Sequence, residues 1–198
     1  MTARGAEKTR LARLEAVSPQ VRELMKPNLL IRDETSADVA VIAEVTVAAF
    51  KTLDVSNQTE HFIIDALRKA NALSISLVGE MDGRVVGHIA FSPVIMSDGT
   101  LGWYGAGPLS VLPEYQRRGI GKALMEAGLL RLRGLNARRC CLVGHPEYYR
   151  QFGFDNVSGL GHEGVPPEVF FALSFDGHMP QGVVAFHDAF KADGGEKG

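Results

Sequence analysis

Two arginines, two glycines and a lysine lie within the seven residues Gln116–Lys122, which read QRRGIGK. They follow an apolar run that ends at Pro113, as a strand would, and they precede a stretch with helical periodicity. The first N–H groups of a helix have no acceptor within the helix, and the helix dipole is positive there. Glycines let an anion approach the backbone, and the basic side chains add formal charge. The combination predicts a phosphate-binding segment, and a pyrophosphate suits it best.

The spacing excludes two other phosphate-binding loops. The nucleoside-triphosphate loop needs Gly-x-x-x-x-Gly-Lys-Ser/Thr, and the dinucleotide fingerprint needs three glycines after the first strand. Here Gly119 and Gly121 lack the third glycine and follow the fourth expected strand. The glycine pair alone is equally typical of an ordinary helix start with small residues for close packing.

The elements around this segment follow from hydrophobic periodicity and turn residues. Thr35 and Asp38 form a weak capping box, and Asp82-Gly83 and Asp98-Gly99 are expected turns. Helices are expected at 35–50, 60–70, 119–133 and 146–152, and strands at 28–32, 74–79, 84–94, about 100–112, 139–143, 169–175 and 183–186. Strands and helices alternate without internal repeats, so the sequence predicts one α/β (α+β) domain.

Several stretches together resemble the GCN5-related N-acetyltransferase (GNAT) superfamily. QRRGIG is similar to its Gln/Arg-x-x-Gly-x-Gly/Ala signature, LSVLPEY to its fourth strand, and YYRQFGF to its tyrosine and closing Gly-Phe. VVGHIAFSPV, GWYGAGPLSVLPEYQRRGIG and GHPEYYRQFGF resemble its YhbS-like subgroup of predicted acetyltransferases. The resemblance covers roughly residues 28–190. It implies a central mixed, mostly antiparallel sheet of about seven strands, splayed between strands 4 and 5 and flanked by helices.

The resemblance also implies acetyl-CoA as co-substrate, with no metal. Pantetheine would pair with the main chain of the fourth strand near Leu109, Ser110 and Val111, because an amide-rich chain can mimic a strand. The slot would lie between Leu109–Leu112 and Cys141–Val143. The segment expected to hold the pyrophosphate comprises Gln116, Arg117, Arg118, Gly119, Ile120, Gly121 and Lys122.

Acetyl transfer to an amine needs a neutral amine, a polarised carbonyl and a proton for the leaving thiolate. Tyr149 occupies the position of the family tyrosine, four residues before Gly153, and is the expected general acid. The alternative is that Tyr149 only hydrogen-bonds the sulfur or packs. Its neighbour Tyr148 is expected to point elsewhere and pack.

Two residues and water are the candidates for the general base. His145 follows the fifth strand close to the expected thioester, and imidazole suits proton transfer near neutral pH; it could also merely order the turn. Glu60 begins the helix that borders the acceptor groove in this family, and it could equally be a helix N-terminal acid stabilised by the dipole. His88 is more typical of a hydrogen-bonded core histidine, and Cys140 with Cys141 of small buried hydrophobes.

The sequence therefore predicts an N-acetyltransferase that transfers acetyl from acetyl-CoA to a primary amine by direct attack in a ternary complex. The alternative is a non-catalytic acyl-CoA-binding regulatory module, which would need no acid or base. A third reading places the function in a basic, amphipathic N-terminal extension that binds a partner.

Charge and composition narrow the partners. The formal net charge is −2, which argues against nucleic acid, although Gln116–Arg139 carries seven Lys or Arg and one acid. No apolar run approaches a membrane span, the N-terminus lacks an apolar signal core, and the adjacent cysteines fit a reducing compartment, so a cytoplasmic location is expected. The expected organisation is an N-terminal extension at 1–26, a GNAT domain at 27–190 and a flexible tail at 191–198, with a homodimer as one expected assembly.

Overall fold

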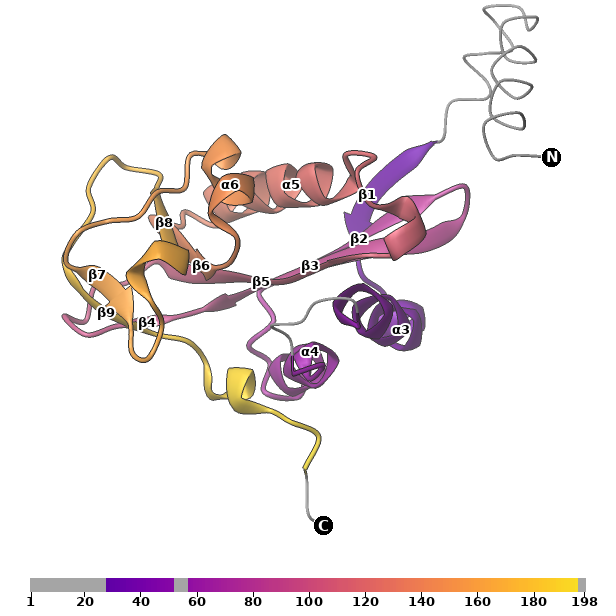
Figure 1. Ribbon diagram of the computed structural model, residues 1–198, viewed down its shortest axis with the longest axis horizontal. Helices are drawn as coiled ribbons and strands as arrows, with labels where there is room; N and C mark the ends of the chain where they lie inside the picture. The colour runs from indigo at the N-terminus through magenta and orange to yellow at the C-terminus, as the bar shows by residue number, and fades with distance from the viewer. Residues whose placement is uncertain (1–27, 52–56, 196–198) are drawn as a thin grey trace, which may run out of the picture.

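The central element is a six-stranded sheet in the order β1-β2-β3-β5-β6-β8 (Figure 1). The computed structural model describes residues 28–51 and 57–195, so the expected extension at 1–26 lies outside the described residues. All neighbouring strands pair antiparallel except β5 and β6, which are parallel. The strands are β1 (Leu29–Asp33), β2 (Ile75–Met81), β3 (Arg84–Pro93), β5 (Trp103–Val111), β6 (Arg139–Val143) and β8 (Phe170–Ser174).

A second sheet of three short strands corrects the expected count of about seven in one sheet. The strand expected at 183–186 is β9 (Gly182–Ala185), and it pairs with β4 (Ile95–Met96) and β7 (Leu160–His162) instead of joining the central sheet. Strands of two and three residues are too short to show an alternating pattern, so β4 and β7 were not predicted.

Helices cover both faces of the central sheet. The helices α5 (Ile120–Gly134) and α6 (Pro146–Tyr149) lie on one face, and α3 (Val39–Phe50) and α4 (Glu60–Lys69) on the other (Figure 1). The predicted capping box of Thr35 and Asp38 is present at the start of the short turn η1 (Ser36–Asp38) that leads into α3. None of the helices in the described ranges is long and apolar enough to cross a membrane.

Glycines bring the first turns of α5 close to the sheet. A Cβ on Gly87 would lie 3.0 Å from Leu124 and 3.1 Å from Ile120, and one on Gly79 would lie 3.2 Å from Ile120. Ile120 and Leu124 are buried in the main core. The start of α5 is therefore held against β2 and β3 by packing that a side chain at either glycine would disturb.

Strands β5 and β6 pair only at one end. Their parallel register runs from Trp103↔Arg139 to Gly105↔Cys141, and β5 continues to Val111 while β6 continues to Val143. After Gly105, β5 pairs only with β3, and after Cys141, β6 pairs only with β8. We call the unpaired edges, Ala106–Val111 of β5 and Leu142–Val143 of β6, the splay. β5 and β6 are the fourth and fifth strands of the central sheet in chain order, so the predicted separation of these two strands is present.

Candidate active site

The segment after β5 turns sharply before α5 begins. A short 3₁₀ turn, η2 (Pro113–Tyr115), follows the strand, and two residues then take left-handed backbone conformations, Arg117 with φ 60° and Gly119 with φ 82°. The first helical bond runs from Ala123 N–H to the Gly119 carbonyl. The N–H groups of Ile120, Gly121 and Lys122 therefore have no acceptor inside the helix, which makes this turn suited to an anion.

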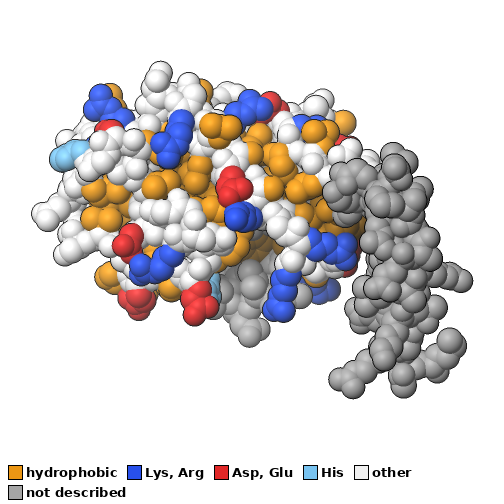
Figure 2. Space-filling view, turned by 90° about the horizontal axis from the view of Figure 1, so that it is seen from above, with side chains coloured by type: hydrophobic (Ala, Val, Ile, Leu, Met, Phe, Trp, Pro, Cys, Tyr) orange, Lys and Arg blue, Asp and Glu red, His pale blue; other side chains and the backbone are white. Residues whose placement is uncertain are grey.

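Side chains around this turn carry positive charge and fix its shape. Arg84 and Arg118 approach the ring of Tyr115, with guanidinium carbons 5.5 and 5.1 Å from its centroid. Gln116 donates a side-chain hydrogen bond of 3.1 Å to the Val111 carbonyl, which ties the turn to the end of β5. Figure 2 shows this face, where Lys and Arg side chains lie around apolar side chains gathered across its middle.

The side chain of Ser110 points away from this turn, toward α3. Its hydroxyl lies 3.2 Å from that of Thr46, which in turn donates a 2.8 Å hydrogen bond to the Ile42 carbonyl. Thr46 has a single hydroxyl proton, so Ser110 donates to Thr46. Ser110 is buried, whereas Leu109 and Val111 are partly exposed. Any ligand along β5 would therefore meet Ser110 through its main chain, as the resemblance implies.

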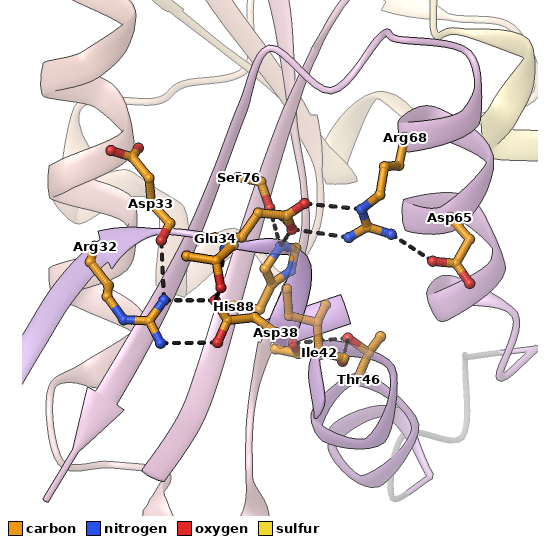
Figure 3. Close-up of polar contacts among 12 residues, drawn as sticks. Arg32, Asp33, Glu34, Asp38, Ile42, Thr46, Asp65, Arg68, Ser76 and His88 are labelled. Carbon is orange, nitrogen blue, oxygen red and sulfur yellow. Dashed lines mark hydrogen bonds and ion pairs between the residues drawn. The ribbon is translucent and has the colours of Figure 1, made fainter. Parts of the chain in front are cut away.

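A partly buried polar network lies on the α3/α4 side of the sheet (Figure 3). Glu34 accepts hydrogen bonds from Arg68, at 2.9 and 3.0 Å, and a short one from Ser76. The Nε2 atom of fully buried His88 lies 2.7 Å from the Ser76 hydroxyl. Burial lowers the pKa of His88 to about 4, so the ring is neutral at pH 7. His88 is thus the hydrogen-bonded core histidine that was predicted.

This network fixes the tautomer of His88. Burial alone would raise the pKa of Glu34, but the hydrogen bonds from Arg68 and Ser76 outweigh it and lower the pKa, so Glu34 is a carboxylate. The only Ser76 hydroxyl proton goes to that carboxylate, and His88 must donate from Nε2. Its Nδ1 then carries a lone pair, and in the described part of the chain this atom is buried without a hydrogen-bond partner.

Tyr149 is packed at the end of β6. Its ring lies against Gly144 so closely that a Cβ there would overlap it, and it contacts Phe154 and Phe171 with centroids 6.3 and 6.4 Å away. Burial raises the pKa of Tyr149 to about 12. Its phenol therefore stays protonated throughout the range in which proteins are assayed, so its hydroxyl proton is available for a hydrogen bond.

Tyr148 points elsewhere than Tyr149 and packs, as expected, and its hydroxyl also reaches another element. A Cβ on Gly121 would lie 2.8 Å from the Tyr148 hydroxyl, so this side chain reaches across to the first turn of α5. Its ring meets those of Tyr149 and Phe152 edge to face, with centroids 5.1 and 5.5 Å away. The spacing of the sequence motif indicated a role only for Tyr149. The contact that distinguishes Tyr148 is with Gly121, which is distant in the chain, so motif spacing could not indicate it.

The two candidate bases come from opposite faces of the sheet. His145 is exposed and occupies the N-cap position of α6, one residue after Gly144, but its side chain makes no capping hydrogen bond. Glu60 is the first residue of α4, on the other face, and it is partly exposed (Figure 1). The structure thus brings His145, Tyr148 and Tyr149 to the same side as α5, and it places Glu60 apart from them.

The cysteines are poor nucleophiles in this structure. Cys140 and Cys141 are both fully buried and free, and burial raises the pKa of each thiol. Their prediction as small buried hydrophobes is confirmed. Within residues 28–51 and 57–195, no group of three or more His, Cys, Asp or Glu side chains could hold a metal ion.

These features define a class of protein. The family model described as an acetyltransferase (GNAT) domain matches residues 72–156, which run from before β2 to beyond α6. YhbS of Escherichia coli strain K12, an uncharacterized N-acetyltransferase, is 31% identical over 128 residues, which are 64% of this chain and 74% of YhbS. The chain belongs to the GNAT acetyltransferase family.

Two solved structures share its fold. A GNAT family acetyltransferase from Brucella melitensis, crystallised in complex with acetyl-CoA, is 50% identical with a TM-score of 0.74, over 82% of this chain and 98% of that one. The E. coli YhbS structure in complex with CoA is 27% identical with a TM-score of 0.75, over 84% of this chain and 93% of that one. The predicted fold and the YhbS-like subgroup are confirmed.

Proposed function

We propose that this chain transfers the acetyl group of acetyl-CoA to a primary amine by direct attack in a ternary complex. One observation carries the proposal: the free N–H groups at the start of α5 lie at the end of β5, whose edge β6 leaves unpaired. A pyrophosphate on α5 and a pantetheine amide chain along the splay would form one continuous site. The acetyl-CoA and CoA complexes of the two similar structures support this assignment.

In this mechanism the neutral amine nitrogen attacks the thioester carbonyl, and the carbon–sulfur bond then breaks. The amine nitrogen loses one proton and the thiolate gains one, so the reaction needs no other reactant. Tyr149 donates a hydrogen bond to the leaving sulfur. Complete proton transfer from a phenol with a pKa of about 12 to a thiolate of pKa about 8.5 would cost roughly 5 kcal/mol. Tyr149 therefore stabilises the thiolate by hydrogen bonding more than by full ionisation.

The proton of the amine is taken by His145, Glu60 or water. His145→Gln and Glu60→Gln separate these routes, because loss of the true base lowers kcat/KM most at low pH, where the amine is mostly protonated. A base variant keeps its affinity for acetyl-CoA. If both variants keep the wild-type pH profile, water carries the proton.

The test of the function is release of free thiol from acetyl-CoA with a panel of primary amines, including polyamines, amino acids and lysine peptides. Amine-dependent release with formation of the acetylated product supports the proposal. Tight acetyl-CoA binding without release from any amine would favour the non-catalytic acyl-CoA-binding module. The acidic C-terminal part of the chain, with seven acids and two lysines over 155–198, favours cationic amines in that panel.

A further inference from the structure

The two neighbouring tyrosines of α6 face different parts of the molecule. Successive residues of a helix are rotated by about 100°. Tyr149 therefore turns inward to Gly144 at the end of β6, and Tyr148 turns toward Gly121 on α5. The edge-to-face contacts of Tyr148 with Tyr149 and Phe152 hold its ring in this direction.

The Tyr148 hydroxyl is a free donor at this position. Among the described residues it makes no hydrogen bond, although its ring is partly buried. Burial, and then the carboxylate of Glu126, raise its pKa, so the phenol keeps its proton at neutral pH. Glu126 itself lies 3.8 Å from Lys122, which adds a positive charge one turn away.

Two sets of donors therefore meet at Gly121. The free N–H groups of the first turn of α5 point out of the helix at its N-terminal end, and the Tyr148 hydroxyl approaches the same turn from α6. Donors that converge without an acceptor between them suit an anionic oxygen. A phosphate oxygen satisfies both, whereas a cation or an apolar group satisfies neither.

We propose that Tyr148 is a binding residue for acyl-CoA, and that its hydroxyl donates a hydrogen bond to a pyrophosphate oxygen seated on the first turn of α5. This inference rests on the proposed function and deepens it. The two tyrosines then have different roles: Tyr148 contributes to the affinity for acyl-CoA, and Tyr149 donates a hydrogen bond to the leaving sulfur. It also gives Gly121 a role, because a side chain there would occupy the place of the Tyr148 hydroxyl.

The test compares Tyr148→Phe with Tyr149→Phe in the full chain, using calorimetric titration with acetyl-CoA and initial rates. Loss of one charge-assisted hydrogen bond predicts that Tyr148→Phe weakens acetyl-CoA binding about tenfold and leaves kcat at saturation within about twofold. Tyr149→Phe should show the reverse, with unchanged affinity and lowered kcat. Because the Tyr148 hydroxyl has no described protein partner, the melting temperature of Tyr148→Phe should equal that of the wild type.

A double-mutant cycle with Gly121→Ala adds a readout that a general packing role would not give. The new methyl group displaces the hydroxyl, so Tyr148→Phe should cost less affinity in the Gly121→Ala background than in the wild type. Wild-type affinity in Tyr148→Phe, or equal losses in both backgrounds, would overturn the inference while acetyl-CoA binding by the wild type stands. A wild-type chain that binds no acetyl-CoA would instead overturn the proposed function itself.

Discussion

The ring of Tyr149 lies directly over Gly144, with the ring edge where a side chain of residue 144 would begin. Gly144 is the residue after β6, so this contact places the phenol at the open end of the splay. The absence of a side chain at position 144 is thus a condition for the orientation of the proposed hydrogen-bond donor, Tyr149. Substitution of Gly144 can therefore test whether the orientation of Tyr149 matters, without changing the tyrosine itself.

Gly144→Ala should displace Tyr149 and lower kcat. The added methyl group overlaps the ring, and relief of such overpacking typically costs about 1–3 kcal/mol of stability. Activity and the urea-unfolding midpoint would be measured together, with Gly134→Ala as control, since a Cβ on Gly134 meets no atom within 4 Å. A Gly144→Ala enzyme with wild-type kcat would show that the position of Tyr149 does not matter for catalysis.

Tyr149→Phe should lower kcat by about tenfold to a hundredfold, as loss of a hydrogen bond to the charged leaving thiolate does. In the wild type, the raised pKa of Tyr149, about 12, keeps the phenol protonated, so the rate should not fall between pH 8 and 10 on its account. Rates across that range, at saturating acetyl-CoA, would be compared for the two proteins. A wild-type alkaline limb that Tyr149→Phe abolishes would contradict this placement of its pKa.

Because Gly119 has a left-handed backbone conformation, substituting it should lower stability through backbone strain, without any steric clash of the new side chain. Its φ is 82°, and a Cβ there would meet no atom within 4 Å, so Gly119→Ala should cost only conformational strain, about 1 kcal/mol. Gly119→Asn should recover part of the loss, because asparagine tolerates this region better. Unfolding midpoints and acetyl-CoA affinities would be measured for both variants. Equal behaviour of Ala and Asn would argue against the strain.

Burial of neutral His88 predicts a loss of stability at mildly acidic pH. The unfolded chain takes up the histidine proton below pH about 6.5, whereas in the folded protein burial lowers the pKa to about 4, with Glu34 opposing and Arg68 reinforcing that shift. The unfolded state therefore binds more protons between these values, and folding weakens as pH falls, by up to roughly 3 kcal/mol.

Urea titrations from pH 7.5 to 4.5 would measure this effect. His88→Gln should lose the slope that His88 causes, although it lowers stability at pH 7, whereas His178→Gln, at an exposed histidine, should keep it. If the stability difference between the wild type and His88→Gln does not shrink toward low pH, His88 does not have the lowered pKa.

Elements whose signals are local were predictable from the sequence. The capping box before α3, the hairpin turn at Asp82–Gly83 and the start of α5 after Gly119 depend on residues a few positions apart, and all three are present. The partial pairing of β5 and β6 needed the resemblance to a family, because nothing local in either strand shows where its neighbour departs.

Features that depend on distant residues were not predictable. Tyr148 and Tyr149 are adjacent in sequence, and only the position of Gly121 across the fold shows what Tyr148 faces. The tautomer of His88 similarly depends on Ser76, which lies on β2 and in turn reaches Glu34. Side-chain directions of this kind follow from packing between elements, which periodicity does not describe.

The central claim is that the chain transfers acetyl groups from acetyl-CoA to amines. The most direct measurement is thiol release from acetyl-CoA by the full chain with the amine panel, with the acetylated product identified by mass spectrometry. The account predicts release that requires one class of amine and falls in Tyr149→Phe. No product from any amine, in a chain that titration shows to bind acetyl-CoA, would contradict it.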